Sequence, residues 1–273
     1  MDRYLVFGNP VSHSLSPRIH AAFAAQTGQT LSYDAREAPL DGFADCARAA
    51  FADGLAGANV TVPFKADAHA IADRVDARAE RAGVVNTLRR EPDGTISAFN
   101  TDGLGLVADL RGHLGFDLRG ARVRLLGAGG AARGVVQALL EAGVAELMVS
   151  NRTPARASAL AGHFRALGPV RMAREAEEAP TDLVINATSA SLAAARPGVS
   201  DSVLAGATLV YDMMYGPRAR PFLEHASALG ADATSDGLGM LVEQAAEAFA
   251  LWRGVRPQTK ELLAELRAEV SGH

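Results

Sequence analysis

The chain has 273 residues, 48% of them hydrophobic and 21% charged, a profile typical of a folded globular protein with a substantial apolar core. Its formal net charge of -4 excludes the basic surface on which nucleic-acid binding depends, and it has no apolar run of the roughly 18 residues that span a bilayer. A single cysteine, Cys46, excludes an internal disulfide, and the seven histidines show no metal-ligand spacing. We therefore expect a cytoplasmic protein with no metal, nucleic-acid partner or membrane partner. The sequence fixes no oligomeric state and allows a homodimer.

Short apolar, β-branched runs alternate with alanine-rich amphipathic stretches along nearly the whole chain. We expect strands at 4–7, 31–35, 57–61, 84–88, 95–99, 122–126, 146–150, 183–186 and 208–212. Helices are expected near 16–26, 40–52, 65–72, 102–113, 130–142, 154–166, 218–229 and 237–253. This alternation predicts the α/β class, with mainly parallel sheets covered by helices on both faces.

A domain boundary is expected near residue 101, because the sequence then restarts with a fresh strand–glycine–helix unit. The predicted helix from about 237 carries an apolar stripe at helical spacing and completes the first domain. The sequence thus predicts two α/β domains. Residues 1–101 with 239–273 form the substrate-binding domain, and 102–238 form a Rossmann-type dinucleotide-binding domain.

The second domain opens with a glycine-rich turn, Gly127-Ala128-Gly129-Gly130-Ala131-Ala132, between a predicted strand and a predicted helix. The three small-residue positions of the dinucleotide fingerprint fall on Gly127, Gly129 and Ala132, which permit the tight turn, the approach of the pyrophosphate and close helix–strand packing. The helix N-terminus offers unpaired N–H groups to the phosphates. We interpret this turn as a nucleotide site rather than a purely structural turn, because strand and helix lie on either side of it.

The end of the next strand decides between NAD and NADP. An NAD enzyme usually has an acidic residue about 20 residues after the glycine turn, to bind the ribose 2′-hydroxyl. Here the segment is Asn151-Arg152-Thr153-Pro154-Ala155-Arg156, with two arginines and no acid. Guanidinium groups suit a 2′-phosphate, so NADP is the expected cofactor. Thr153 before Pro154 also has the pattern of a helix N-cap, which would leave both arginines free.

Polar clusters interrupt the apolar elements of the first domain. They are Asn9 to Pro17, Asn59 to Lys65, Asn86-Thr87 and Asn100 to Asp102. Each has an ordinary structural explanation, since Ser16 before Pro17 and Asp102 at a helix start are good N-caps and a lone lysine is usually a surface charge. Most of them nevertheless fall at strand ends, where parallel α/β sheets bind ligands.

As a group, these hydroxyls, amides, one ammonium and one carboxylate suit a small polyhydroxylated substrate. A hydride that moves onto a ketone leaves negative charge on the oxygen, which needs a proton donor or a cation nearby. Lys65 and Asp102 are the candidates for that work.

These motifs resemble the bacterial shikimate dehydrogenase family over nearly the whole chain. The matching segments are Ser14-Leu15-Ser16-Pro17, Asn59 to Lys65, Asn86-Thr87, Asn100 to Gly103, Gly127 to Ala131, Asn151-Arg152-Thr153, Asn186-Ala187-Thr188, Tyr211-Asp212-Met213, Asp236 to Leu241 and Gln244-Ala245-Ala246. The resemblance implies NADP-dependent interconversion of 3-dehydroshikimate and shikimate.

The resemblance also implies roles for single residues. Lys65 and Asp102 would form the catalytic pair, and we expect Lys65 to donate the proton on reduction while Asp102 orients it. The implied substrate-binding residues are Ser14 and Ser16 on the carboxylate, Thr61, Asn86 and Gln244 on the ring hydroxyls and carbonyl, and Tyr215. The implied cofactor-binding residues are Gly127, Ala128, Gly129, Gly130, Ala131, Asn151, Arg152, Thr153, Arg156, Met213 and Gly237.

The sequence departs from the family pattern at two places. Ser189-Ala190-Ser191-Leu192 stands where the family often has glycine before a hydrophobic residue, so the loop on the nicotinamide side is expected to differ. Arg220 replaces the usual threonine before Pro221, with a modest effect expected on the start of that helix.

Two other functions stay open. A related quinate/shikimate dehydrogenase of relaxed specificity often prefers NAD, and the Asn151-Arg152-Thr153 segment argues against that preference. A catalytically silent dinucleotide-binding paralogue would have no need of the Lys65–Asp102 pair. Folate-linked methylene dehydrogenases share the general architecture but not Ser14, Ser16 and Asp102.

Overall fold

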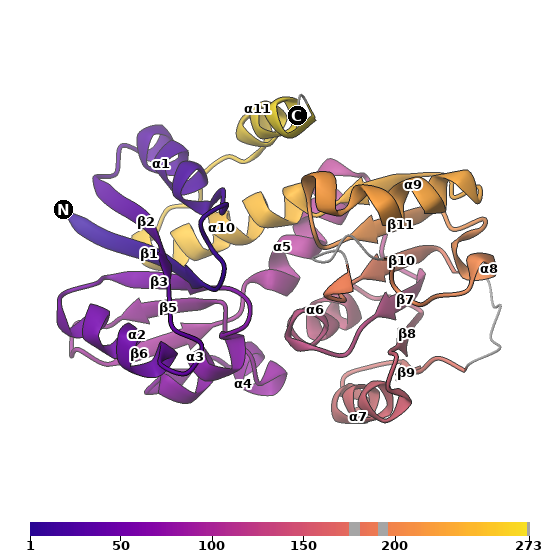
Figure 1. Cartoon of the computed structure of the whole chain (residues 1–273), viewed down its shortest axis with the longest axis horizontal. Helices are drawn as coiled ribbons and strands as arrows, with labels where there is room; N and C mark the ends of the chain where they lie inside the picture. Colours follow the sequence, from indigo (N-terminus) through magenta and orange to yellow (C-terminus); the bar gives the residue numbers. More distant parts are fainter. Residues whose placement is uncertain (175–180, 191–195, 272–273) are drawn as a thin grey trace. The chain divides into compact units, whose positions relative to one another are not determined.

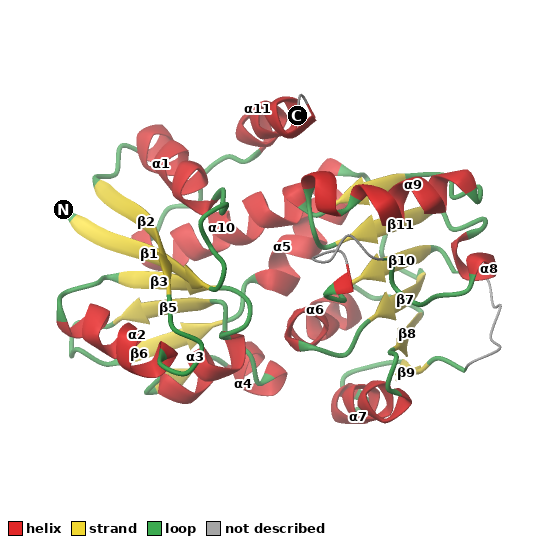
Figure 2. Cartoon of the chain, in the orientation of Figure 1, coloured by secondary structure: helices red, strands yellow, loops and turns green. Residues whose placement is uncertain are grey.

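The computed structural model describes residues 1–174, 181–190 and 196–271, and the chain divides into two compact units. The first unit comprises Met1–Gly105 with Leu241–Leu262, and the second comprises Leu106–Met240 with Leu263–His273. Each unit has a sheet covered by helices on both faces (Figure 2). The predicted α/β class is confirmed.

The first unit contains a six-stranded sheet in the order β2-β1-β3-β5-β6-β4 (Figure 1). Its strands are β1 (Asp2–Gly8), β2 (Leu31–Glu37), β3 (Gly57–Val60), β4 (Arg74–Val75), β5 (Thr87–Arg90) and β6 (Ile96–Phe99). Its helices are α1 (Ser16–Thr27), α2 (Phe43–Ala52), α3 (Lys65–Ile71) and α4 (Ala77–Ala82), with the start of α5 (Asp102–Ala108) and most of α10 (Leu238–Arg253).

Strand β1 is apolar throughout its buried part because helices cover both faces of the sheet. Tyr4 and Val6 belong to one buried cluster, which Trp252 of α10 also contacts. Leu5 and Phe7 belong to the other cluster, beneath α2 and α3. The alternation of the two sets along the strand places one on each face.

One strand of the first sheet runs against the others, and this decides where the polar segments meet. β5 pairs antiparallel with β3 and β6, whereas the other pairs are parallel. The start of β5 therefore lies at the same edge as the carboxyl ends of β3 and β6. Asn86, which was predicted inside a strand at 84–88, precedes β5 and lies at this edge.

The second unit contains a six-stranded sheet in the order β12-β11-β10-β7-β8-β9, with every pair parallel. Its strands are β7 (Arg122–Leu126), β8 (Glu146–Ser150), β9 (Val170–Met172), β10 (Leu183–Asn186), β11 (Leu209–Asp212) and β12 (Thr234–Asp236). Its helices are α6 (Gly130–Glu141), α7 (Pro154–Phe164), α8 (Asp201–Leu204), α9 (Arg220–Ala228) and α11 (Lys260–Ser271), with a 3-10 turn at Gly216–Arg218. This strand order is that of the Rossmann fold, and it reverses between β7 and β10, where dinucleotides bind.

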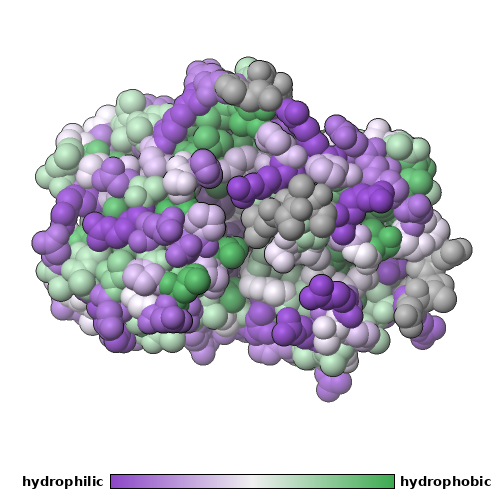
Figure 3. Space-filling view, viewed as in Figure 1, coloured by the Kyte–Doolittle hydropathy of each residue, from purple (hydrophilic) through white to green (hydrophobic). Residues whose placement is uncertain are grey.

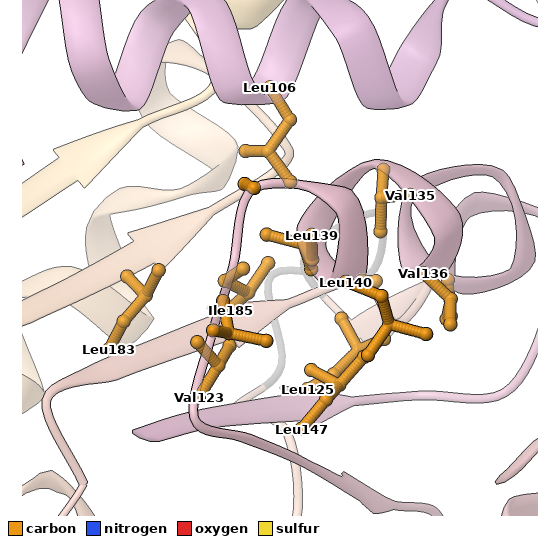
Figure 4. Close-up of a cluster of buried hydrophobic side chains, with 14 of the residues drawn as sticks. Leu106, Val123, Leu125, Val135, Val136, Leu139, Leu140, Leu147, Leu183 and Ile185 are labelled. Atoms are coloured by element: carbon orange, nitrogen blue, oxygen red, sulfur yellow. The ribbon is translucent and has the colours of Figure 1, made fainter. Parts of the chain in front are cut away.

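The core of the second unit is a cluster of aliphatic side chains between the sheet and α6 (Figure 4). Val123 and Leu125 of β7 and Ile185 of β10 point toward Leu139 of α6, and all four are fully buried. Such burial stabilises by roughly 1.5–3 kcal/mol for each large aliphatic side chain. It fixes the turn between β7 and α6, on which the expected nucleotide site depends.

The C-terminal helix differs from the expected domain division. The sequence assigned all of 239–273 to the first domain, but residues from Leu263 onward belong to the second unit. The reason is side-chain contact, since Arg267 of α11 forms an ion pair with Asp236 at 3.2 Å. The boundary near 101 lies at 105 in the structure.

Several short elements were not predicted: β4, α4, β9, α8, β12 and the 3-10 turn, together with α11. The predicted helix 102–113 changes to a π-helical turn over Asp109–His113. Among the described residues, no helix is long and apolar enough to cross a membrane. Charged and polar side chains cover much of the face in Figure 3, with smaller apolar patches between them.

Candidate active site

Lys65 and Asp102 form a close ion pair in the first unit, with Nζ and Oδ2 2.5 Å apart. Their side chains are 16% and 6% exposed, so the pair is largely shielded while the ammonium still reaches solvent. Lys65 begins α3 and Asp102 begins α5. The Asn100 Oδ1 accepts the Asp102 backbone N–H at 3.0 Å. The expected capping role of Asp102 is wrong, because its Oδ2 bonds to Lys65 and its Oδ1 accepts from Asn86.

Asn86 joins this pair to the rest of the polar cluster. Its Nδ2 donates to Asp102 Oδ1 at 2.8 Å and lies 3.2 Å from Gln244 Oε1. Gln244 can reach this place because Gly105 lets α5 approach α10, where an added Cβ would lie 2.7 Å from the Gln244 Cβ. The structure therefore brings Lys65, Asn86, Asp102 and Gln244 together from four segments of the sequence.

The two expected carboxylate ligands lie at the start of α1. The Ser14 Oγ accepts the Ser16 backbone N–H at 3.2 Å, and Ser16 shares a side-chain hydrogen bond with Tyr33. The expected N-cap role of Ser16 is wrong, because Ser16 is the first helical residue and Leu15 occupies the cap position without a side-chain bond. The first backbone N–H of α1 is thus bonded to Ser14, whereas the Ser16 hydroxyl bonds to Tyr33.

Thr61 follows β3 at the same edge of the sheet. Its backbone N–H donates to Phe7 O at 2.8 Å, which ties it to the end of β1. Gly8 makes room for it, since a Cβ on Gly8 would lie 2.6 Å from the Thr61 Cγ2. The half-buried Thr61 thus lies where the ends of β1 and β3 meet.

The glycine turn of the second unit has the geometry that the fingerprint requires. Gly127 has a φ of +111°, and an added Cβ would lie 3.0 Å from Ala187 O, so only glycine fits. Ala132 is fully buried against the core. A Cβ on Gly129 would meet nothing within 4 Å, although Gly129 directly precedes α6. The space beside Gly129, directly before the N-terminus of α6, is therefore open, which fits a pyrophosphate.

The segment after β8 presents its basic side chains to solvent. Asn151 Nδ2 donates to Thr153 O at 3.0 Å and tightens the turn. Arg152 and Arg156 are exposed, and within the described ranges no ion pair involves either of them. Thr153 occupies the N-cap position of α7 but makes no side-chain cap bond, so that part of the expectation is wrong. The donors of this segment suit a phosphate group.

Met213, Tyr215 and Gly237 lie close together in the second unit. A Cβ on Gly237 would lie 2.4 Å from Met213 O, so the backbone at Gly237 packs directly on Met213. Asp236 holds the neighbouring turn, because its Oδ2 accepts the Gly216 N–H at 2.9 Å. Tyr215 directly precedes this turn, and its substrate role stays a prediction.

No individual role was assigned from the sequence to four residues of the polar cluster: Tyr33, Asn59, Thr87 and Thr101. Tyr33 is the one buried residue of β2, and nothing in the sequence of that strand marks its hydroxyl as part of a site. Thr87 and Thr101 stand beside Asn86 and Asp102 in matched motifs, and that adjacency was the available signal. Of the departing loop, Ser191 and Leu192 lie outside the described residues. Across the part of the chain that the structure describes, no group of three or more His, Cys, Asp or Glu side chains could hold a metal ion.

Three protein-family descriptions match the chain in sequence order. Residues 6–88 match the shikimate dehydrogenase substrate binding domain. Residues 110–211 match the shikimate / quinate 5-dehydrogenase family, and residues 237–267 match the shikimate 5'-dehydrogenase C-terminal domain. The three matches cover both units.

Individual relatives agree with these matches. A shikimate dehydrogenase (NADP(+)) from Thioalkalivibrio sulfidiphilus is 53% identical over 98% of each chain. The crystal structure of an Ael1 enzyme from Pseudomonas putida has a TM-score of 0.91 at 46% identity, covering 97% of this chain and 98% of that one. The Thermus thermophilus shikimate 5-dehydrogenase, solved with NADP(H) and shikimate, has a TM-score of 0.86 at 36% identity, covering 98% of this chain and 99% of that one. The chain belongs to the shikimate dehydrogenase family.

Proposed function

We propose that the chain catalyses the NADP-dependent, reversible reduction of 3-dehydroshikimate to shikimate, with Lys65 and Asp102 handling the proton. The enzyme is an oxidoreductase. The observation that carries the proposal is the shielded Lys65–Asp102 pair, with Nζ and Oδ2 2.5 Å apart, inside a cluster of amides and hydroxyls. A protein that only binds a dinucleotide would have no use for this pair.

The proton chemistry follows from the two side chains. NADPH, held by the glycine turn and the arginines of the second unit, would supply the hydride that converts the substrate ketone to an alkoxide. The Lys65 ammonium then gives one proton to the alkoxide oxygen, and the free amine regains a proton from solvent. The Asp102 carboxylate holds the ammonium in place through Oδ2, while its Oδ1 accepts from Asn86 at 2.8 Å. In the reverse direction Lys65 acts as the base.

Substrate binding is assigned to the polar groups at the same sheet edge. The hydroxyls of Ser14 and Ser16 are assigned to the substrate carboxylate. Ser14 Oγ accepts the Ser16 N–H and keeps its own proton to donate, and Ser16 would turn its hydroxyl from Tyr33 to the carboxylate. Thr61, Asn86 and Gln244 supply hydroxyl and amide groups for the ring hydroxyls. Residues 1–101 with most of α10 therefore act as the substrate domain.

Cofactor binding is assigned to the second unit. The open space before α6 fits the pyrophosphate, and the exposed guanidiniums of Arg152 and Arg156 fit the 2′-phosphate of NADP. Met213 and Gly237 are assigned to the nicotinamide half. These groups would bind and orient the cofactor without any change in the core beneath them.

The direct test is an assay of the purified protein at alkaline pH with shikimate and NADP, following the absorbance of NADPH. We expect turnover with this pair, and far lower kcat/KM when NAD replaces NADP or quinate replaces shikimate. Comparable kcat/KM for quinate would support a quinate/shikimate dehydrogenase of relaxed specificity. Absence of turnover with every combination would support a silent paralogue and overturn the proposal.

Two expectations about the protein in its cell and in solution are part of the proposal. A cytoplasmic location agrees with a chain whose one cysteine can form no internal disulfide. A homodimer is tested by sedimentation equilibrium, which measures the mass of the particle directly. A mass equal to the 28.4 kDa chain would exclude the dimer.

A further inference from the structure

A line of buried hydrogen bonds runs from Tyr33 to the carboxylate of Asp102. The Tyr33 hydroxyl lies 2.7 Å from Asn59 Oδ1, and Asn59 Nδ2 lies 3.1 Å from Thr87 Oγ1. Thr87 Oγ1 lies 2.9 Å from Asn86 Oδ1, and Asn86 Nδ2 lies 2.8 Å from Asp102 Oδ1. All five residues are buried, with Thr87 fully so.

The orientation of both amides follows from their fixed neighbours. Asn86 Oδ1 faces the Thr101 backbone N–H at 2.8 Å, which can only donate, and Asn86 Nδ2 faces a carboxylate oxygen. Asn59 Nδ2 faces the backbone carbonyl oxygen of Asn86 at 3.2 Å, and this oxygen can only accept. A reversed amide at either position would therefore set acceptor against acceptor or donor against donor.

The hydroxyl protons then have one consistent arrangement. Tyr33 donates to Asn59 Oδ1, and burial raises the pKa of Tyr33 well above its ordinary value, which keeps the phenol protonated. Thr87 accepts from Asn59, and its own proton points to Asn86 Oδ1 at 2.9 Å, which is closer than the alternative acceptor Thr101 Oγ1 at 3.4 Å. Every donor in the line points toward Asp102. Hydrogen bonds in such a chain reinforce one another.

We propose that Thr87, Asn59 and Tyr33 are positioning residues, which hold the Asn86 amide so that its NH2 group faces the Asp102 carboxylate. The inference rests on the proposed role of the Lys65–Asp102 pair. None of the three is assigned to contact the substrate. These residues act on Asp102 through Asn86, and Thr87 is the one of the three whose side chain bonds directly to the Asn86 side chain.

The test compares Thr87→Val with Thr87→Ser. Valine has the shape of threonine without the hydroxyl, so Asn86 Oδ1 loses one donor and Asn59 loses an acceptor. We expect kcat to fall roughly tenfold, as for the loss of one buried hydrogen bond, and Thr87→Ser to restore most of it. The affinity for NADP should stay unchanged. Loss of activity in Thr87→Val without rescue by serine would overturn the proposal.

A double-mutant cycle tests whether Thr87 acts through Asn86. In an Asn86→Ala background the Thr87→Val change should cost no further activity, because the amide that it positions is gone. An equal loss in both backgrounds would contradict the proposal. Tyr33→Phe should have a smaller effect of the same kind. Tyr4→Phe is its matched control, because Tyr4 pairs with Tyr33 in the adjacent strand and lies outside the line.

Two measurements separate this inference from folding defects and from the proposed function. Trp252 donates to Leu88 O at 2.9 Å, next to Thr87, so its fluorescence in urea reports whether a variant keeps this region folded. In protein with labelled asparagine amides, Thr87→Val should broaden or shift the NH2 signals of Asn86 by NMR, and Thr87→Ser should not. If these signals change in a protein that does not oxidise shikimate, the proposed function fails and the positioning role stands. Unchanged signals would overturn the positioning role.

Discussion

The substrate cluster of the first unit and the cofactor segment of the second hold their polar groups in opposite ways. Around Asn86 the side chains are buried and bonded to one another, and the whole residues Asn86 and Asp102 are 3% and 4% exposed. After β8 the arginines are exposed, and the turn before α6 relies on backbone shape at Gly127 and Gly129. The proposed chemistry therefore depends on a preorganised network, whereas the proposed phosphate binding depends on glycine geometry and free cations.

This difference predicts how mutations combine. Substitutions within the Asn86 cluster share hydrogen bonds and should be strongly non-additive. Arg152 and Gly129 belong to the second unit, where the cofactor segment lies, and substitutions there should change cofactor binding alone.

The largest expected effect is that of Lys65→Ala on turnover. Removing the proposed proton donor should lower kcat about 10²–10⁴-fold, the usual contribution of general acid–base catalysis. NADPH binding, measured by fluorescence titration, should change little. Because Asp102 loses its ion-pair partner in this variant, the fold must be checked, and Trp252 fluorescence in urea does so. Near-normal turnover in a folded Lys65→Ala protein would refute the catalytic assignment.

A pair of glycine substitutions should separate fold from cofactor binding in the second unit. Gly127→Ala forces a side chain onto a φ of +111° and against Ala187 O, so we expect it to destabilise the unit by roughly 1–3 kcal/mol. Gly129→Ala meets no protein atom within 4 Å, so the fold should keep its stability while the Kd for NADP rises. Circular dichroism in urea and a cofactor titration measure the two effects. Equal effects of both variants on stability would contradict this reading of the turn.

The sequence predicted the fold class, most long elements and the fingerprint turn, because these depend on local apolar spacing and on glycine. The helix-cap explanation of Ser16 and Asp102 was wrong, because an N-cap pattern is local whereas their side-chain partners, Tyr33 and Lys65, are distant in sequence. Thr153 was placed correctly at the N-cap position of α7, although its side chain makes no cap bond. The antiparallel direction of β5, which brings Asn86 to the site edge, could not be predicted, since strand direction is set by pairing across the sheet. That α11 belongs to the second unit was missed for the same reason, because Arg267 of this helix pairs with Asp236, which lies 31 residues away.

Arg152→Ala should have an intermediate effect on the cofactor side. Loss of a charge-assisted bond to the 2′-phosphate should raise the KM for NADP roughly 10–100-fold. The KM for shikimate and the kinetics with NAD should stay unchanged, because NAD has no 2′-phosphate. Arg152→Lys is the matched variant that keeps the charge and loses the forked donors, and its KM should fall between the two. An unchanged KM for NADP in Arg152→Ala would exclude this arginine from the 2′-phosphate site.

The smallest expected effect concerns the stability of the first unit, through His20. This ring is fully buried and stacks on Tyr33 with the ring centroids 4.2 Å apart. Burial lowers the pKa of His20 from 6.5 to about 3, so the folded protein keeps the ring neutral while the unfolded chain takes up a proton below about pH 6.5. The neutral His20 ring therefore contributes its full stabilisation above pH 6.5, the pKa in the unfolded chain. This stabilisation is lost as the pH falls toward about 3, the pKa in the folded protein.

Between about pH 7.5 and about pH 5.5 this linkage should lower the free energy of unfolding by roughly 1.4 kcal/mol. Urea unfolding followed by Trp252 fluorescence measures it, because Trp252 lies 5.3 Å from the His20 ring and is the chain's one tryptophan. His20→Phe keeps an aromatic ring in the stack and removes the titrating group, so its unfolding free energy should lose that part of the pH dependence. If His20→Phe showed the same pH dependence as the wild type, the buried ring could not be its source.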